Sequence, residues 1–137
     1  MARSVNLLAP ACFLLLLLLL VQVARSEENK KCTPASVVVL QTSNGEKAGD
    51  NPVFEVLVRN RCECAVRGVH LSAEGFASSV PVDPKVFRQE GENYIVGDGS
   101  PIESGGEVRF RYAAERAFQI DPAALQEDCS GVHEFTV

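Results

Sequence analysis

The feature that most constrains this fold is a set of four cysteines, Cys32, Cys62, Cys64 and Cys129, downstream of a leucine-rich run that ends near Val23. In the secretory pathway the usual fate of a cysteine is a disulfide bond, and small secreted domains depend on such bonds. A chain-entropy account gives each bond about 2–4 kcal/mol of stability. The pattern therefore predicts a small, secreted, disulfide-bonded domain.

The region 1–26 has the layout of a secretory signal peptide. Arg3 supplies the basic charge, an apolar stretch runs from Ala11 to Val23, and Ala24-Arg25-Ser26 offers small residues at the cleavage-defining positions. The apolar stretch is shorter than the roughly 20 residues of a membrane-spanning helix, so we expect cleavage after Ser26. Cys12 leaves with this leader, and an even number of cysteines remains for pairing.

The region 27–137 has the size of a single domain with one modest core. The whole chain carries a net charge of −5, and loss of the leader removes two arginines, which makes the product more acidic. This charge argues against nucleic acid or an anionic membrane as the main partner. No second apolar run follows the leader, so we expect a freely secreted protein without membrane insertion.

Strand-type runs separated by turn residues make up most of this region. In the run 107–112, apolar side chains alternate with charged ones, the pattern of a strand with one dry and one wet face. The run 53–59 places Phe54, Val56 and Val58 on one face and is partly apolar on the other. Several short strands at such spacing predict an all-β fold, either a small antiparallel β-sandwich or an open barrel.

The spacing of the two central cysteines restricts their pairing. If Cys62-Glu63-Cys64 is extended, the two side chains leave the same face about 6.5 Å apart, too far for their sulfurs to bond comfortably. We therefore expect Cys62 and Cys64 to bond separately to Cys32 and Cys129, one each. The spacing does not determine which of them bonds to which.

Neither a metal site nor a catalytic site is predicted. The Cys-x-Cys spacing lacks the two to four intervening residues usual for zinc ligands, and His70 and His133 are isolated in the sequence. The chain has no Gly-x-Ser-x-Gly, no glycine-rich phosphate loop and no His-Glu-x-x-His. We expect no cofactor and no enzymatic activity.

A series of short motifs extends in order from Cys32 to Cys129. These motifs are Ser36–Gln41, Phe54–Val56, Asn60-Arg61-Cys62, Val69–Ser72, Phe76–Val80, Pro84–Arg88, Val96–Pro101 and Phe110–Ala113. Their order and spacing resemble those of the TAPETUM DETERMINANT family of small secreted plant proteins. The resemblance covers nearly the whole span between the two outer cysteines.

The chain departs from the family pattern at two of six cysteine positions, where Ala73 and Tyr94 stand instead. Loss of a pair leaves no unpaired thiol if those two cysteines are bonded to each other in the family. The resemblance thus supports separate bonds from Cys62 and Cys64 to the outer cysteines. It also predicts a looser link between the strand that ends at Ser72 and the turn at 97–101.

The resemblance implies a secreted protein ligand in the apoplast. Its partner would be the ectodomain of a leucine-rich-repeat receptor kinase of the EXCESS MICROSPOROCYTES type, in control of cell fate during anther and tapetum development. Phe87 and Arg88 are candidate receptor contacts, because an aromatic residue and an arginine in a loop make plausible anchors. The competing interpretation is that Phe87 fills the core and Arg88 is a solvated charge. The oligomeric state is left open.

An alternative function is an extracellular carbohydrate or cell-wall binding module, since β-sandwiches often serve as scaffolds for sugar binding. Such modules usually need exposed aromatic side chains. This chain has no tryptophan and only two tyrosines, Tyr94 and Tyr112. The alternation around Tyr112 predicts that this side chain faces the core.

Overall fold

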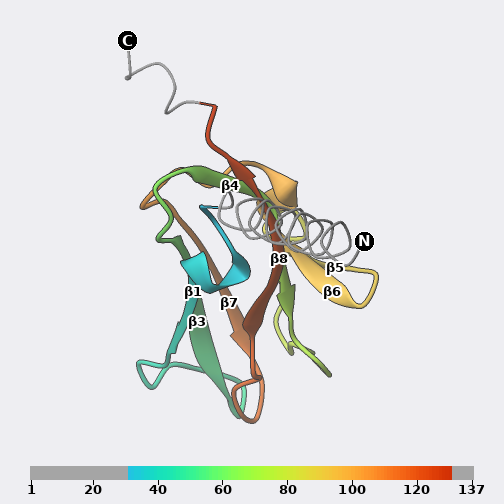
Figure 1. The fold of residues 1–137 in the computed structure, drawn as a ribbon. Helices are drawn as coiled ribbons and strands as arrows, with labels where there is room; N and C mark the ends of the chain where they lie inside the picture. Colours follow the sequence, from blue (N-terminus) through green and yellow to red (C-terminus); the bar gives the residue numbers. More distant parts are fainter. Residues whose placement is uncertain (1–30, 131–137) are drawn as a thin grey trace, which may run out of the picture. The chain divides into compact units, whose positions relative to one another are not determined.

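The structure is a computed structural model that describes residues 31–130 of the chain (Figure 1). The predicted leader 1–26 with Cys12 lies outside the described residues, and so does His133.

Two four-stranded sheets make up the described domain, and every strand pairing in them is antiparallel (Figure 1). The first sheet contains β1 (Val37–Thr42), β2 (Lys47–Ala48), β3 (Asn51–Asn60) and β7 (Glu107–Ala113). The second contains β4 (Ala65–Ser72), β5 (Phe87–Glu90), β6 (Asn93–Val96) and β8 (Asp121–Asp128). Two short 3-10 turns accompany them, η1 (Pro34–Ser36) and η2 (Gly97–Gly99).

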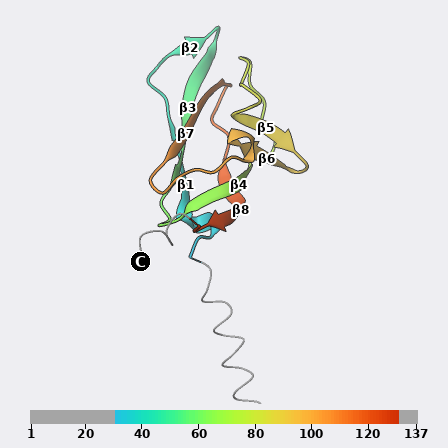
Figure 2. The same ribbon diagram turned by 90° about the horizontal axis from the view of Figure 1, so that it is seen from above.

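The two sheets lie against each other as two layers, with one hydrophobic core formed from both (Figure 2). This arrangement confirms the predicted all-β fold and selects the sandwich over the open barrel. In the first sheet β3 is central: β7 pairs with one of its edges, and β1 and β2 pair with the other. In the second sheet the order is β5-β6-β4-β8.

The period-2 patterns place the side chains on the faces that the sequence predicted. Val56 and Val58 of β3 are fully buried, as is Tyr112 of β7, which pairs with Phe54 in register. The charged residues between the apolar ones on β7 are exposed. Val66 and Leu71 of β4 are fully buried in the same core, which joins the two sheets.

An aromatic cluster fills one part of this core. Phe87 stacks on Phe110 and on Tyr94, with ring centroids 4.3 Å and 4.7 Å apart. Phe76, from the segment after β4, meets Phe87 and Tyr112 edge-on at centroid distances of 5.1 Å. Because these rings come from both sheets, they hold together segments that are distant in the sequence.

The two positions that depart from the family cysteine pattern lie in or beside the core. Ala73 is buried just after β4, and Tyr94 of β6 pairs in register with Leu71 of β4. Beyond η2, Val66 and Ile102 exchange both backbone hydrogen bonds, at 3.0 Å and 2.7 Å. Hydrogen bonds therefore join β4 to the segment after the 97–101 turn, and the predicted looseness of that link stays a prediction.

Candidate functional site

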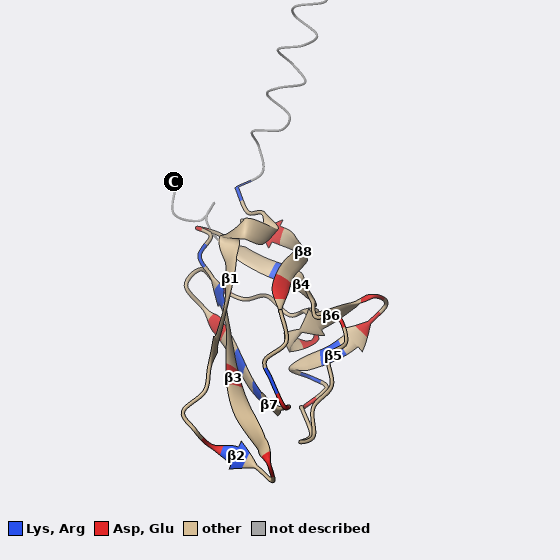
Figure 3. Cartoon of the chain, turned by 90° about the horizontal axis from the view of Figure 1, so that it is seen from below, with Lys and Arg blue, Asp and Glu red and all other residues tan. Residues whose placement is uncertain are grey.

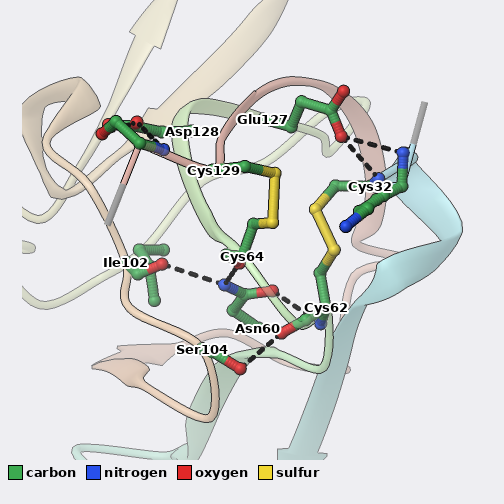
Figure 4. Close-up of a disulfide and its surroundings, with 11 residues drawn as sticks. Cys32, Asn60, Cys62, Cys64, Ile102, Ser104, Glu127, Asp128 and Cys129 are labelled. Carbon is green, nitrogen blue, oxygen red and sulfur yellow. Dashed lines mark hydrogen bonds between the residues drawn. A yellow bond between two sulfur atoms is a disulfide. The ribbon is translucent and has the colours of Figure 1, made fainter. Parts of the chain in front are cut away.

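The structure pairs Cys32 with Cys62 and Cys64 with Cys129 (Figure 4). Their Cα atoms are 5.6 Å and 4.8 Å apart, within the usual range for a disulfide. The expectation that the two central cysteines bond separately to the outer ones is confirmed, and the open choice of partner is resolved. Cys62-Glu63-Cys64 lies in a bend between β3 and β4 instead of an extended strand. This bend is thus tied to both ends of the described domain.

Asn60, at the end of β3, is the one buried polar residue of the described core, with an exposed fraction of 0%. Its side-chain amide donates to the carbonyl oxygens of Cys64 and Ile102, both at 2.9 Å, and its Oδ1 accepts the N–H of Cys62 at 2.8 Å (Figure 4). The side chain thereby shapes the bend that carries both central cysteines. Sequence reasoning did not assign it this role, although the motif Asn60-Arg61-Cys62 contained the signal.

Two further contacts attach neighbouring segments to the disulfide region (Figure 4). The Glu127 carboxylate on β8 accepts the N–H groups of Lys31 and Cys32 at 2.9 Å and 3.0 Å. The Ser104 hydroxyl donates to the carbonyl oxygen of Cys62 at 2.6 Å. These partners are backbone groups of the chain itself, so the region acts as a structural anchor for the domain.

The two predicted receptor contacts occupy different environments. Phe87 is only 3% exposed, because β5 pairs with β6 in a way that points its ring into the aromatic cluster. The prediction of a surface contact is therefore wrong for the Phe87 side chain, which fills the core as the competing interpretation expected for this residue. Arg88, the next residue on β5, points outward and forms an ion pair with Asp98 at 2.6 Å. Its guanidinium also donates to the Pro84 carbonyl oxygen at 3.2 Å.

A larger charged surface covers the outer side of the first sheet, where basic and acidic positions lie close together on β3 and β7 (Figure 3). We call this surface the arginine face. It consists of Arg59, Arg109 and Arg111 with their acidic partners Glu46, Glu55 and Glu107.

Ion pairs connect the members of the arginine face. Arg109 contacts Glu55 at 3.0 Å and Glu107 at 3.3 Å, while Arg59 donates through Nε to Glu107 at 2.9 Å. Arg111 pairs with Glu46, in the loop that precedes β2. The Arg109 side chain remains 60% exposed, so these contacts orient its guanidinium without covering it.

The same contacts perturb the ionisation of two groups. The hydrogen bond from Arg59 is the main reason that the pKa of Glu107 is lowered from its usual value. The hydrogen bond to Glu55 is the main reason that the pKa of Arg109 is raised. Both shifts favour the charged forms, so the contacts maintain opposite charges side by side. The sequence indicated that Glu107, Arg109 and Arg111 share a wet face, but it did not identify their partners on β3 and in the loop that precedes β2.

Other kinds of site find little support in residues 31–130. Within that range no group of three or more histidine, cysteine or acidic side chains is placed to hold a metal ion. No helix in the same range is long and apolar enough to cross a membrane. Tyr112 is fully buried and Tyr94 is stacked on Phe87, so neither tyrosine offers an open sugar-binding platform.

Together, these features define a small disulfide-bonded β-domain that presents a set of paired charges, the arginine face, on its surface. Residues 33–130 match the family model described as "Tapetum determinant 1, C-terminal". The chain belongs to this tapetum determinant family, as the resemblance of its motifs indicated.

Curated relatives agree with this assignment. The chain is similar to TPD1 protein homolog 1A of Oryza sativa subsp. japonica, with 34% identity over 91 residues, 53% of this chain and 40% of the relative. It is also similar to TPD1 protein homolog 1 of Arabidopsis thaliana, with 28% identity over 97 residues, 69% of this chain and 54% of the relative. The chain thus spans about half the length of these relatives. No solved structure matches it.

Proposed function

We propose that this chain is a secreted protein ligand that binds the ectodomain of a leucine-rich-repeat receptor kinase. Its role would be cell-fate signalling during anther and tapetum development, without catalysis, in the apoplast. Membership of the tapetum determinant family supports this proposal. The structural observation that carries it is the arginine face, an exposed and internally paired set of charges on a disulfide-bonded sheet.

Pre-orientation is the physical advantage of this face. A free arginine side chain loses rotamer freedom when it binds, at a cost of about 0.5–1.5 kcal/mol. The ion pairs of Arg109 with Glu55 and Glu107 restrict this freedom before a partner arrives. The guanidinium can then offer its remaining N–H groups to a carboxylate in a bidentate contact.

The mixture of charges favours specificity over simple attraction. A partner must place acidic groups against the arginines and basic or hydrogen-bonding groups against the glutamates, because like charges brought together are penalised. Solenoid receptors present an extended concave surface on which such a pattern can be matched across several repeats. Arg88 lies on the second sheet and would form a separate, smaller contact.

The test is a binding measurement with the full secreted protein, after its two disulfides have been verified by peptide mapping. Calorimetry against a panel of leucine-rich-repeat ectodomains should identify at least one that binds. Arg109→Gln should then raise the Kd at least about tenfold, as expected for an interface arginine. The matched control is Arg67→Gln, which removes an exposed arginine from β4 in the other sheet.

The outcomes separate the role of the face from the role of the protein. If the protein binds none of the ectodomains, the proposed ligand function is contradicted. If an ectodomain binds and Arg109→Gln and Arg67→Gln weaken this binding equally, only the assignment of the arginine face as the binding surface is contradicted.

A further inference from the structure

One edge of the first sheet lacks the protection that sheet edges usually carry. The edge strand β1 has the sequence Val-Val-Val-Leu-Gln-Thr, with no charged residue, proline or glycine. The other long edge strands all carry charged residues: β7 has three, β8 has three and a proline, and β5 has two. Natural sheets use such residues to prevent unwanted pairing at exposed edges. The bare edge of β1 is therefore a place where another strand can add.

The hydrogen-bonding direction of β1 follows from its register. Arg61 donates its N–H to Ser36, on the β1 side, whereas Asn60 donates its N–H to Gly106, on the β7 side. Alternate residues of an antiparallel strand direct their backbone groups toward opposite neighbours. The odd-numbered residues of β3, Leu57 among them, therefore face β1. Because Leu40 pairs in register with Leu57, Leu40 and its alternate neighbours direct their backbone groups toward β3. The N–H and C=O groups of Val39 and Gln41 then point away from β3. Within residues 31–130 these groups have no backbone partner.

Leu40 is placed symmetrically between these groups. Leu40 is 46% exposed, and among residues 31–130 it is the one large hydrophobic residue that is exposed. It lies on the outer side of the sheet, in register with Leu57 of β3. The free backbone groups and the exposed apolar side chain are thus centred on one residue.

We propose that β1 pairs with β1 of a second copy of this chain, antiparallel about a two-fold axis at Leu40. In this register Val39 lies opposite Gln41 of the second copy, and each such pair exchanges two backbone hydrogen bonds. All the unpartnered groups of Val39 and Gln41 are then satisfied. Leu40 faces Leu40 of the second copy in a non-hydrogen-bonded pair, the closer kind, with Cα atoms about 4.5 Å apart.

The edge of β1 favours pairing with the same edge of a second copy. A two-fold arrangement uses each β1 edge once and closes into a dimer instead of an open fibre. The edge of β7 would not permit the same contact: an axis at Arg109 places this residue against itself, and an axis at Phe110 places Arg109 against Arg111. The edge of β1 brings no charged residue of its own against another.

The net charge of the chain adds a prediction about salt. Two copies, each with a net negative charge, repel each other at long range, although the contact itself is neutral. Salt screens this repulsion, so the dimer should become tighter as ionic strength rises. An association held by cross-copy ion pairs would show the opposite trend.

The experiment is sedimentation equilibrium of the oxidised secreted protein over a range of concentrations. The wild-type protein should pass from monomer to dimer as concentration rises. Leu40→Lys and Leu40→Glu should each weaken the dimer at least about tenfold, because each places like charges opposite one another at the axis. Mixing the two variants in equal amounts should restore a dimer, since opposite charges then meet. The control Ala123→Lys adds a charge at an exposed position of β8 and should change nothing.

A second measurement, on the wild-type protein, tests the proposal even if a variant folds poorly. Hydrogen exchange of the wild-type protein should show that the Val39 and Gln41 amides become protected as the dimer forms. A wild-type protein that stays monomeric at every concentration would overturn the proposal. So would folded Leu40 variants that dimerise like the wild type, or an equal mixture that stays monomeric. The test needs no receptor and does not depend on the proposed function.

Discussion

The side-chain amide nitrogen of Asn60 lies 2.9 Å from the carbonyl oxygen of Ile102, and this contact joins the end of β3 to the segment that precedes β7. The same amide group holds the Cys64 carbonyl, and its oxygen holds the Cys62 N–H. One neutral side chain thus satisfies three backbone groups around the bend between the disulfides. The geometry of both disulfides depends on this bend.

Asn60→Ala should therefore destabilise the domain more than its size suggests. The substitution removes the partner of the Cys64 carbonyl and of the Cys62 N–H in a buried site, whereas the Ile102 carbonyl keeps the hydrogen bond from the Val66 N–H. Each unsatisfied group costs about 1–3 kcal/mol. We expect the free energy of unfolding, measured in urea, to fall by about 2 kcal/mol or more. Asn51→Ala is the control, because the Asn51 amide donates only to the Ser79 hydroxyl at the surface. Equal effects of the two substitutions would contradict the anchoring role.

The two disulfides should contribute unequally to stability. Cys64–Cys129 encloses a sequence separation of 65 and Cys32–Cys62 one of 30. In the chain-entropy account, the longer loop adds about 0.7 kcal/mol to the effect of its disulfide. Replacing Cys64 and Cys129 together by serine should thus destabilise the domain more than replacing Cys32 and Cys62 together. Urea unfolding of the two double variants checks the order, and the reverse order would show that native-state contacts outweigh loop entropy.

Tyr112→Phe should loosen the segment between β7 and β8. The Tyr112 hydroxyl donates to Gln41 Oε1 at 2.6 Å and accepts the Phe118 N–H at 2.9 Å. Burial raises the pKa of Tyr112, so the neutral hydroxyl is the form that the fold stabilises. We expect a loss of about 1–3 kcal/mol in unfolding free energy and faster hydrogen exchange at Phe118.

The sign of the Tyr112 shift also predicts a pH dependence. A folded-state pKa above the unfolded value gives stability that is present below the unfolded pKa of about 10 and is lost as pH rises through the folded pKa.

The control for Tyr112→Phe is Tyr94→Phe, because the Tyr94 hydroxyl has no hydrogen-bond partner within residues 31–130. The prediction fails if the two variants lose equal stability at neutral pH.

Glu107→Gln should reduce stability in a way that depends on pH. The pKa of Glu107 is lowered in the folded state, chiefly by its hydrogen bond from Arg59. Its ionic contribution is then present above the unfolded pKa of about 4.3 and is lost as pH falls through the folded pKa. Unfolding curves of wild type and variant should differ near neutral pH and converge in acid. The matched change Glu92→Gln, at an exposed residue between β5 and β6, should give no such convergence.

Substitutions at the neighbours Phe87 and Arg88 should separate stability from binding. Phe87→Ala removes a ring stacked between two others in the core and should cost about 3–5 kcal/mol in unfolding free energy. Arg88→Glu alters an exposed ion pair, so its effect on stability should stay within about 1 kcal/mol. If Arg88 contacts the receptor, Arg88→Glu should also raise the Kd. Unchanged binding would remove it from the contact surface.

Much of the fold could be predicted from the sequence because the relevant pattern is local. Alternation along 107–112 needs only a few neighbouring residues, and a strand must place successive side chains on opposite faces. The buried Tyr112 and the exposed arginines of β7 followed from this rule. The separate pairing of Cys62 and Cys64 was also predicted from local spacing, although the segment bends and is not the extended strand on which that prediction was based.

The sequence by itself thus determined the fold class, the separate bonding of the two central cysteines and the family. Tertiary structure decided which outer cysteine meets Cys62, which way Phe87 points and which glutamates join Arg109. These relationships depend on strand order and register, which bring together residues far apart in the chain. Asn60 shows the same limit: its partner Ile102 is 42 positions away, and no local rule specifies that their segments meet.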